Sequence, residues 1–526
     1  MDKEQKETAA PLDIKFQQRF SKNLVSNIIY FVLQFVIGIA LVPYFIDTLG
    51  SAVYALIPLA TSVTGYVIFI LDAMNAAISR FLSIDLQKGK RDEANITYNT
   101  AFFGVCGLVA VLIPVSIILS ILAPYIFNVG SESFIEVTLF FLFILSSSLI
   151  RAFSAPFTAS FVAYNRIDYT NLTNSTNVVT QVLFIVISFI IFEPSLLSVG
   201  IAYIIAALLS TVLACILFKK TVPYLSIHLH LFSKEKFKWI GDQAFWSTFH
   251  TIGNLLRFPI CLIIVNIMFG AVAETQFSLG VTLCNAILAI SALITSTFRP
   301  QIYLYRSKED VKGVVEFGRI SIKLVGFIMA LPTALICVFS AEILTIWVGE
   351  EFSNIYLLIW ILVIPIFINT MVACIGPINA AYLKVRPVAI MNFIIGVGNV
   401  ILALILPSLL NNGIYGVGMA CAFSITLMNG VFQPLYNAYI LKAPPHSFII
   451  PMFSGSGALV ILILFTYLYS QIVPVTTILE LIISCCLIGA VYCALLRFIL
   501  KKSEREVIYS LIPKSIRTHI PKRLFI

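Results

Sequence analysis

Three charged side chains lie inside long apolar runs of the sequence, where a charge is costly. They are Asp72, Arg151 and Arg257. A charge near the centre of a bilayer costs about 2.5–3.5 kcal/mol on insertion scales, so such residues usually face a bundle interior or a water-filled cavity. An arginine in such a place can form strong, often bidentate, hydrogen bonds to a phosphate. These three positions are therefore the first candidates for chemistry.

Arg257 is the best placed of the three, near the middle of its apolar run. His250, Asn254 and Arg257 are spaced i, i+4 and i+7, so they share one face of a helix. We predict that this face lines a cavity and that Arg257 binds the anionic part of a substrate. The alternative is that these side chains form hydrogen bonds between helices and so stabilise packing.

Asp72 and Arg151 lie in the inner halves of their apolar runs, and two interpretations stay open. They could form a structural salt bridge, or Asp72 could be a cation or proton site. Asp72 shares roughly one helix face with Thr61, Asn75 and Ser79.

The sequence carries no catalytic constellation. It has no P-loop, and its five histidines form no metal cluster. Its ten cysteines lie in apolar runs, which is typical of small buried hydrophobic residues. We therefore expect no enzyme activity, no cofactor and no metal.

The elements that position these residues are long apolar segments. The chain has 526 residues, 60% hydrophobic and 11% charged, with a mean hydropathy of +0.99, whereas soluble proteins carry about 25% charged residues. A membrane-spanning helix needs about 20 apolar residues. Such runs lie near 24–46, 52–79, 98–122, 134–157, 174–192, 197–218, 244–269, 277–298, 316–340, 354–382, 388–408, 413–440, 449–470 and 475–499. We predict an all-α integral membrane protein with about fourteen transmembrane helices. The first run is too long for a signal-peptide core.

The charges outside these runs predict the topology. Lys and Arg gather in alternate connections and in both tails, while the other connections hold acids instead: Asp47, Glu132, Glu193, Glu274, Glu350 and Glu351. The positive-inside rule then places both termini in the cytoplasm, with the chain in the cytoplasmic membrane. The net charge of +9 does not indicate nucleic-acid binding, because almost no soluble segment exists to carry such a domain.

The two halves of the chain resemble each other at a shift of 218–220 residues. Gly50 matches Gly270, and Ala163–Tyr164 matches Ala381–Tyr382. Because the shift spans six helices, the pattern predicts two six-helix bundles related by an axis along the membrane normal, plus two extra C-terminal helices. Substrate sites of repeat-built transporters lie at the repeat interface, so this repeat favours a transporter.

The repeat adds four more candidate residues. Asn27 and Gln34 give the first helix a polar stripe on the face that matches the stripe of Arg257. Arg80 and Arg299 are repeat mates at cytoplasmic helix ends. They are either positive-inside anchors or an inner gate that binds anionic headgroups.

These patterns divide the chain into six predicted parts. They are a cytoplasmic N-tail (1–22), an N-terminal six-helix lobe (23–218), a basic cytoplasmic linker (219–243), a C-terminal six-helix lobe (244–441), the extra helices 13 and 14 (442–500) and a basic cytoplasmic C-tail (501–526).

Several short patterns carry a resemblance to a known family over residues 20–440. They are Asn27 and Gln34 ahead of Pro43–Tyr44–Phe45–Ile46, Ala77–Ile78–Ser79–Arg80 ahead of a charged loop, and Asn392 with Asn399. The chain resembles the Wzx-type oligosaccharide (O-antigen and polysaccharide) flippases of the multidrug/oligosaccharidyl-lipid/polysaccharide exporter superfamily.

The resemblance implies alternating access of a lipid diphosphate-linked oligosaccharide for cell-surface polysaccharide biosynthesis. It implies two lobes around a central cavity lined mainly by helices one, two, seven and eight. Partners would be the lipid-linked substrate, membrane lipids and other membrane proteins of polysaccharide assembly. Helices 13 and 14 resemble the extra pair of lipid II flippases, so that branch stays open.

Two further alternatives belong to other classes. A cation-coupled multidrug exporter of the same superfamily would be expected to carry an acid inside its first helix, where this chain has only the terminal Asp47. A glycan polymerase or ligase would need a sizeable outward loop with catalytic side chains, and the outward connections here are short.

Overall fold

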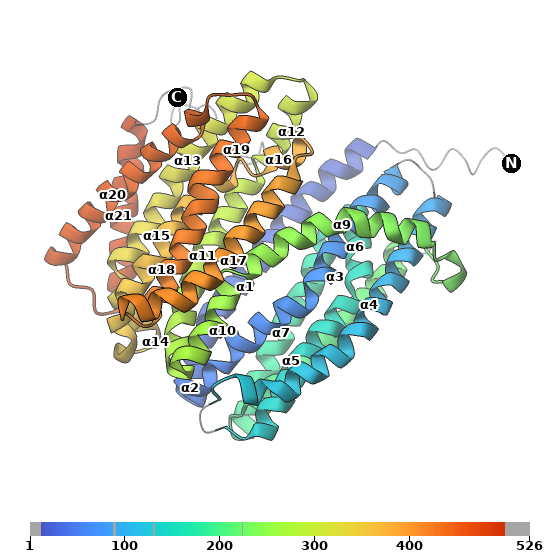
Figure 1. The fold of residues 1–526 in the computed structure, drawn as a ribbon, viewed down its shortest axis with the longest axis horizontal. Coiled ribbons are helices and arrows are strands. Elements are labelled where there is room, and N and C mark those ends of the chain that lie inside the picture. The colour runs from blue at the N-terminus through green and yellow to red at the C-terminus, as the bar shows by residue number, and fades with distance from the viewer. Residues whose placement is uncertain (1–11, 88–90, 130–131, 223–224, 500–526) are drawn as a thin grey trace. The chain divides into compact units, whose positions relative to one another are not determined.

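The computed structural model describes residues 12–87, 91–129, 132–222 and 225–499 (Figure 1). Over these residues every regular element is a helix, and fourteen helical segments are long and apolar enough to cross a membrane. The predicted all-α membrane class and the number of spans are therefore confirmed. The axis that relates the two bundles stays a prediction.

The bounds of the elements follow the hydropathy pattern, with several spans divided into two pieces. The elements are α1 (Leu12–Leu49), α2 (Ser51–Tyr54), α3 (Leu56–Gln87), α4 (Arg91–Ile126), α5 (Phe134–Phe153), α6 (Ala155–Ala163), α7 (Ile167–Ile191), α8 (Leu196–Thr221), η1 (Leu229–Leu231), α9 (Lys234–Leu255), α10 (Phe258–Phe269), α11 (Ala271–Ser296), α12 (Arg299–Ser307), α13 (Val311–Val338), α14 (Ser340–Val348), η2 (Glu350–Ile355), α15 (Tyr356–Ala373), α16 (Pro377–Ala381), α17 (Val385–Leu410), α18 (Ile414–Ile425), η3 (Thr426–Phe432), α19 (Gln433–Ile440), η4 (Pro445–Ser447), α20 (Ile449–Ile472) and α21 (Ile478–Ile499).

The helices form two compact units, each with its own core. The first unit comprises Met1–Leu255 and Asn266–Val272, and the second comprises Leu256–Val265 and Ala273–Ile526. The chain passes from one unit to the other within the seventh span. The lobe boundaries predicted from the sequence remain predictions.

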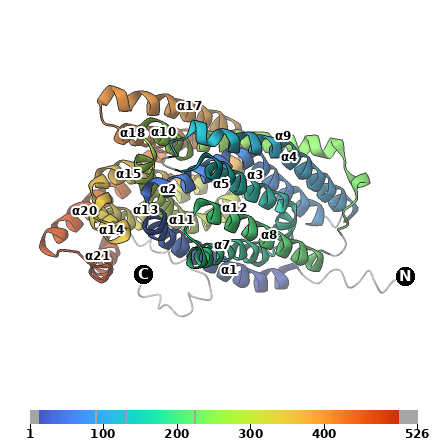
Figure 2. The ribbon, with the colours of Figure 1, turned by 90° about the horizontal axis from the view of Figure 1, so that it is seen from below.

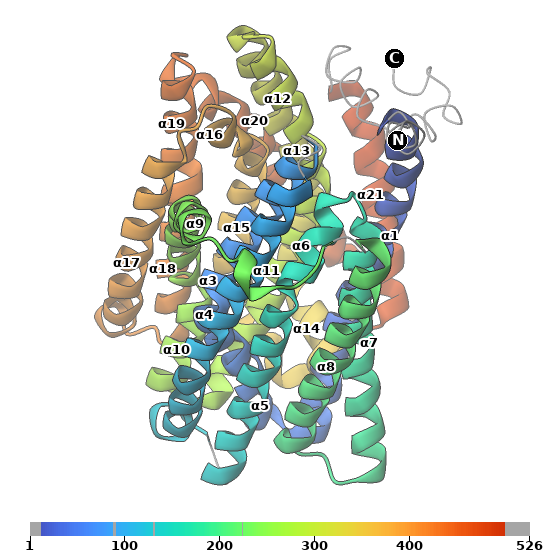
Figure 3. The same ribbon diagram turned by 90° about the vertical axis from the view of Figure 1, so that its right-hand side faces the viewer.

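In the first unit, α1, α7 and α8 lie side by side, and α5 packs against α8 (Figure 3). The helices approach closely where small residues face large ones. A Cβ added at Gly200 of α8 would lie 3.1 Å from the Phe143 Cβ of α5. Small residues at helix contacts are typical of membrane bundles, because they let backbones come together. At the other end of the unit, an aromatic cluster fills the core with Tyr98, Phe102, Phe157, Phe161 and Phe218.

The segment that leads into α9 is held against α4 by backbone hydrogen bonds. The His228 amide donates to Asn99 Oδ1 (2.7 Å), and the Ser233 amide donates to Thr100 Oγ1 (3.0 Å). Lys236, in the first turn of α9, forms an ion pair with Glu93 of α4 (2.5 Å). Part of the predicted basic linker is therefore an ordered connection whose polar contacts fix where α9 begins.

In the second unit, α20 and α21 pack against α13 (Figure 2). The closest approach is between two glycines: a Cβ added at Gly326 of α13 would lie 2.9 Å from the Gly455 Cα of α20. The Tyr492 hydroxyl of α21 donates to the Phe327 carbonyl oxygen (2.8 Å). The last two spans are thus integral to this unit.

The two halves of the sequence repeat show the same local backbone features at the predicted shift. Gly50 and Gly270 both turn the chain with positive φ, 83° and 87°. Asn165 and Leu383 both adopt the left-handed region, with φ of 54° and 55°. Because few non-glycine residues adopt such angles, this agreement supports the internal repeat independently of residue identity.

Candidate functional site

A polar pocket surrounds Arg151 inside the first unit. Its volume is about 270 Å³, and it lies at the level of the membrane spans. The lining residues are Ile68, Ser148, Arg151, Ala152, Ser154, Ala155, Thr158, Thr170, Thr173, Asn174 and Ser210. Hydroxyl, amide and guanidinium groups therefore meet in a region where most side chains are apolar.

A break in the fourth span builds this pocket. The helix stops at Phe153 and restarts at Ala155, with Pro156 in the first turn of α6. Proline has no N–H and cannot bond the carbonyl four residues earlier, so an interior proline kinks a helix. The Ser154 hydroxyl instead donates to the Arg151 carbonyl oxygen (2.7 Å). Arg151 thus occupies the last turn before the break.

The Arg151 side chain is exposed to the pocket, and Nη2 donates to Asn174 Oδ1 of α7 (3.3 Å). None of the ion pairs among the described residues involves Arg151. The side chain of Asp72, its predicted partner, lies outside the described residues, so their salt bridge stays a prediction. The pocket has the groups to bind an oxyanion together with hydroxyl-bearing neighbours.

Arg257 sits at a second break, in the seventh span of the second unit. The span is interrupted at Leu256–Arg257, two residues before Pro259. Asn399 Nδ2 of α17 donates to the freed Leu256 carbonyl oxygen (2.9 Å). The Ser424 hydroxyl donates in turn to Asn399 Oδ1 (3.2 Å). The break is therefore stabilised by buried polar side chains, as membrane helices require.

Arg257 is only 8% exposed, and its Nε–H has no hydrogen-bond partner among the described residues. A buried donor without a partner costs about 1–3 kcal/mol, so a ligand that supplies an acceptor would recover that loss. The predicted water-filled cavity around this residue, and its role with His250 and Asn254, stay predictions.

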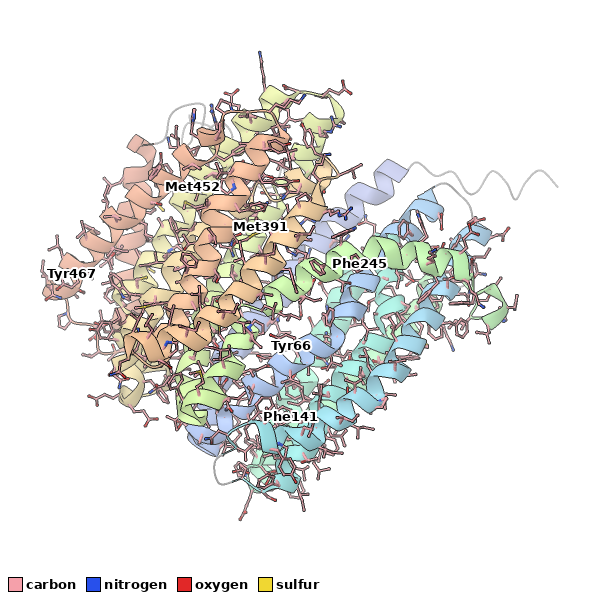
Figure 4. The ribbon with its side chains drawn as sticks, viewed as in Figure 1. Tyr66, Phe141, Phe245, Met391, Met452 and Tyr467 are labelled. Carbon is pink, nitrogen blue, oxygen red and sulfur yellow. The ribbon has the colours of Figure 1, made fainter. Side chains whose placement is uncertain are left out.

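On the N-terminal side of the same break, the Tyr66 hydroxyl of α3 donates to the Leu255 carbonyl oxygen within the first unit (2.5 Å; Tyr66 is labelled in Figure 4). His250 Nδ1 and Asn254 Nδ2 lie 3.4 Å apart, and Asn254 is exposed. These positions show where the side chains lie, without testing their predicted roles.

The other predicted residues occupy varied surroundings. Asn27 Oδ1 accepts a hydrogen bond from Asn171 Nδ2 (2.6 Å), so this residue joins α1 to α7. Gln34 is exposed, and Arg299 is exposed at the start of α12. The Arg80 side chain lies outside the described residues. Asn27 therefore has a structural contact between two helices, in addition to its predicted role in a cavity.

Glu274 was expected in an outward connection, and that interpretation is wrong. Gly270 makes the turn in one residue, so the helix resumes at Ala271 and Glu274 falls in the first turn of α11. Its side chain is fully buried, and neither carboxyl oxygen has a hydrogen-bond partner among the described residues. An acid in a first turn is favoured by the helix dipole, but its burial had no signal in the sequence.

A second group that the sequence did not reveal lies at the other end of the first unit. Arg166 donates from Nε and Nη2 to the two Asp168 carboxyl oxygens (3.0 and 3.1 Å), and Lys22 Nζ lies 3.3 Å from the same carboxylate. These bonds from Asp168 raise the pKa of Arg166. Asn23 Oδ1 accepts the Asp168 amide (3.1 Å), which ties α1 to the start of α7.

Comparison with known proteins decides which family carries this architecture. The family model described as "Polysaccharide biosynthesis protein" matches residues 20–302, more than half of the chain. The chain belongs to this polysaccharide biosynthesis family. A relative in Bacillus subtilis (strain 168), "Uncharacterized membrane protein EpsK", is 27% identical over 82% of this chain and 85% of its own length.

Two solved structures share the fold of this chain. "Lipid II flippase MurJ, inward closed conformation" matches with a TM-score of 0.66 and 14% identity, over 90% of this chain and 99% of that one. An inward-facing "multidrug resistance MATE family transporter of the MOP superfamily" matches with a TM-score of 0.61 and 14% identity, over 82% and 94%. The resemblance noted in the sequence is confirmed: the chain is a multi-pass membrane protein with the flippase and exporter fold.

Proposed function

We propose that this protein translocates a lipid diphosphate-linked oligosaccharide across the cytoplasmic membrane by alternating access, for cell-surface polysaccharide biosynthesis. Membership of the polysaccharide biosynthesis family and the fold shared with a lipid II flippase support this substrate class. The observation that carries the proposal is the polar pocket around Arg151, which offers a cation and several hydroxyl groups at the depth of the spans.

The chemistry of the pocket suits an amphiphile with a charged, sugar-bearing head. A guanidinium binds phosphate oxygens through parallel hydrogen bonds. Thr158, Thr170, Thr173 and Ser210 can exchange hydrogen bonds with sugar hydroxyls. The head would otherwise have to shed its water in an apolar region, so such a pocket lowers the barrier to transfer without any bond being made or broken. We therefore propose transport without catalysis.

Arg257 contributes a second cation in this proposal. A substrate phosphate would supply the acceptor that its Nε–H lacks, and the charge of the ligand would offset the cost of the buried guanidinium. His250, Asn254, Gln34 and Asn27 would act as further cavity residues. Arg80 and Arg299 would attract the anionic head, and Asp72 would couple transport to an ion.

Reconstitution tests the proposal directly. The full-length protein in liposomes should move a fluorescent undecaprenyl diphosphate-linked oligosaccharide between leaflets, and Arg151→Ala should reduce the rate at least tenfold. Lys219→Ala, which removes an exposed cation of the same unit that lies outside this pocket, is the matched control and should retain most of the rate. Transfer of lipid II at a higher rate would favour a peptidoglycan precursor flippase. Cation-dependent export of ethidium with no lipid transfer would favour a multidrug exporter.

The proposed orientation places both termini in the cytoplasm, where other membrane proteins of polysaccharide assembly would deliver the substrate. Single cysteines at positions 234 and 306 should react with an impermeant maleimide only after permeabilisation, in a variant lacking the ten native cysteines. Cysteines at positions 132 and 350 should react in intact cells. Labelling with the opposite pattern would reverse the orientation and contradict the direction of transport.

A further inference from the structure

A small basic pocket lies in the first unit, apart from the pocket of Arg151. Its volume is about 190 Å³, and its lining residues are Tyr164, Arg166, Tyr169, Lys220 and Thr221. They come from the ends of three spans, which close at Ala163, open at Ile167 and close at Thr221. The pocket therefore lies at the level of the lipid headgroups, on the side that the charge pattern predicts to be cytoplasmic.

Arg166 is held in a fixed orientation before any ligand arrives. Its ion pair with Asp168 engages Nε and Nη2, at 3.0 and 3.1 Å, and leaves Nη1 outside the pair. Its guanidinium carbon lies 3.6 Å from the centre of the Tyr169 ring. A guanidinium locked on two sides loses little freedom when it binds an anion.

Lys220 adds a second cation to the pocket. It lies in the last turn of α8, it is exposed, and among the described residues it forms no hydrogen bond or ion pair. Lys22, on the far side of Asp168, brings a third positive charge. Three cations against one carboxylate leave the pocket net positive.

We propose that this pocket binds the phosphate group of an anionic membrane lipid. Two cations of different kinds, hydroxyls from Tyr164, Tyr169 and Thr221, and a depth matched to the headgroups all fit a phosphodiester whose acyl chains stay in the bilayer. A basic pocket between helices on the cytoplasmic side is a recurring form of lipid headgroup site. Tyrosine at this depth is also favoured, because its ring is apolar and its hydroxyl is polar.

The second unit does not repeat this arrangement. At the repeat shift, Arg166 corresponds to Lys384 and Asp168 corresponds to Arg386. The carboxylate that orients the guanidinium is therefore absent from the matching turn. A lipid bound in the first unit alone would stabilise one unit selectively, which a general attraction between the basic surface and the membrane would not do.

Neighbouring lysines provide a sharp test. Lys219 and Lys220 are both exposed at the end of α8, but only Lys220 lines the pocket. The purified full-length protein would be titrated with phosphatidylglycerol in micelles, and bound lipid would be counted by native mass spectrometry. We expect Lys220→Gln to weaken binding about tenfold, since it removes a charge-assisted hydrogen bond. Lys219→Gln should change the lipid affinity by no more than about twofold.

Arg166→Lys should also weaken binding about tenfold, because an ammonium cannot keep both bonds to Asp168 and still reach the ligand.

Two outcomes would overturn the proposal. Equal weakening by Lys219→Gln and Lys220→Gln would mean a diffuse surface attraction, and no weakening by either would mean that lipid binds elsewhere. Inorganic pyrophosphate separates the two sources of phosphate: it should bind at least tenfold more weakly than phosphatidylglycerol, and equal affinity would make the site one for free phosphate. Because the measurement is lipid binding, a negative result would leave the proposed transport function standing.

Discussion

The two halves of the sequence repeat share backbone features and differ in the charged residues placed inside their apolar spans. At the repeat shift, Gly50 and Gly270 make equivalent turns, and Asn165 and Leu383 adopt the left-handed region after the fourth and tenth spans. Four charged residues of the spans, however, have uncharged repeat mates. The pairs, with the charged residue first, are Asp72 and Ser291, Arg151 and Asn369, Arg257 and Ile37, and Glu274 and Tyr54. The shared features are those that a helical hairpin needs, so the unshared charges are the better guide to function.

The two units also differ in whether equivalent spans are continuous helices. The first and sixth spans of the first unit are the continuous helices α1 and α8. Their counterparts in the second unit are interrupted, the seventh at Leu256–Arg257 and the twelfth by the π-helical turn Thr426–Phe432. Single π-helical turns are frequent at functional sites. Asn399 and Ser424, which brace the first interruption, come from the eleventh and twelfth spans. Polar side chains of the eleventh and twelfth spans therefore stabilise the irregular backbone beside Arg257.

The largest effect should come from removing Arg257 and leaving its repeat mate as the control. We expect Arg257→Ala to reduce accumulation of surface glycan at least tenfold at normal membrane abundance, because no other cation replaces a lost charge-assisted bond. Arg257→Lys should restore part of the activity, since an ammonium lacks the planar fork. Ile37→Ala should export at nearly the original rate. Unchanged export by Arg257→Ala would make this residue a packing element.

The shared turns predict equal effects in the two halves of the sequence repeat. Gly50 has φ 83° and ψ 157°, a region that only glycine adopts without strain, and Gly270 has a similar φ of 87°. Gly50→Ala and Gly270→Ala should each lower the free energy of unfolding by about 1–3 kcal/mol. Neither new Cβ would meet a close neighbour: none lies within 4 Å at Gly50, and the nearest lies at 3.5 Å at Gly270. Thermal unfolding in detergent measures both, and a difference between them beyond about 1 kcal/mol would contradict the equivalence of the turns.

The sequence predicted the features that depend on composition along the chain. Long apolar runs, alternating charge and repeated glycines determine the number of spans and the repeat. It did not predict the burial of Glu274. The turn is made by one glycine, so Glu274 lies in a helix and not in a solvated connection. It also did not predict that Lys22 and Asn23 contact Asp168, since these contacts depend on how α1 meets the start of α7. Pro156 and Pro259 made breaks possible at these positions, but proline alone does not locate a break, since Pro43, Pro114 and Pro332 lie inside continuous helices.

Glu274 and Tyr54 give a subtler contrast. The Tyr54 ring stacks near Phe45 (6.4 Å between centroids), whereas the buried Glu274 carboxyl has no hydrogen-bond partner among the described residues. Glu274→Gln should therefore raise the free energy of unfolding by about 1 kcal/mol, because a carboxyl must be protonated to be buried without a partner, whereas an amide is already neutral. Thermal unfolding of this variant beside the unmodified protein checks this, and marked loss of stability in Glu274→Gln would reveal a partner that only a carboxyl can bond.

The smallest effect concerns the left-handed residues, where the same substitution should act with opposite signs. Leu383 is 81% exposed and gains little from its side chain, yet it adopts φ 55°. A left-handed conformation costs about 1–2 kcal/mol for a residue with a Cβ, and glycine removes this strain. Glycine also makes the unfolded chain more flexible, which lowers stability by about 0.5–1 kcal/mol. Leu383→Gly should therefore stabilise the protein by about 0.5 kcal/mol.

Asn165 occupies the matching turn, but its side chain is part of the fold. Asn165 Oδ1 accepts a hydrogen bond from Asn23 Nδ2 (3.0 Å), which helps to join α1 to the turn before α7. Asparagine also tolerates the left-handed region better than leucine does, so glycine relieves less strain here, while a hydrogen bond worth about 1 kcal/mol is lost. Asn165→Gly should therefore destabilise the protein by about 0.5 kcal/mol. Chemical denaturation of the two variants side by side measures the difference, and a shift of the same sign in both would mean that backbone strain alone governs these turns.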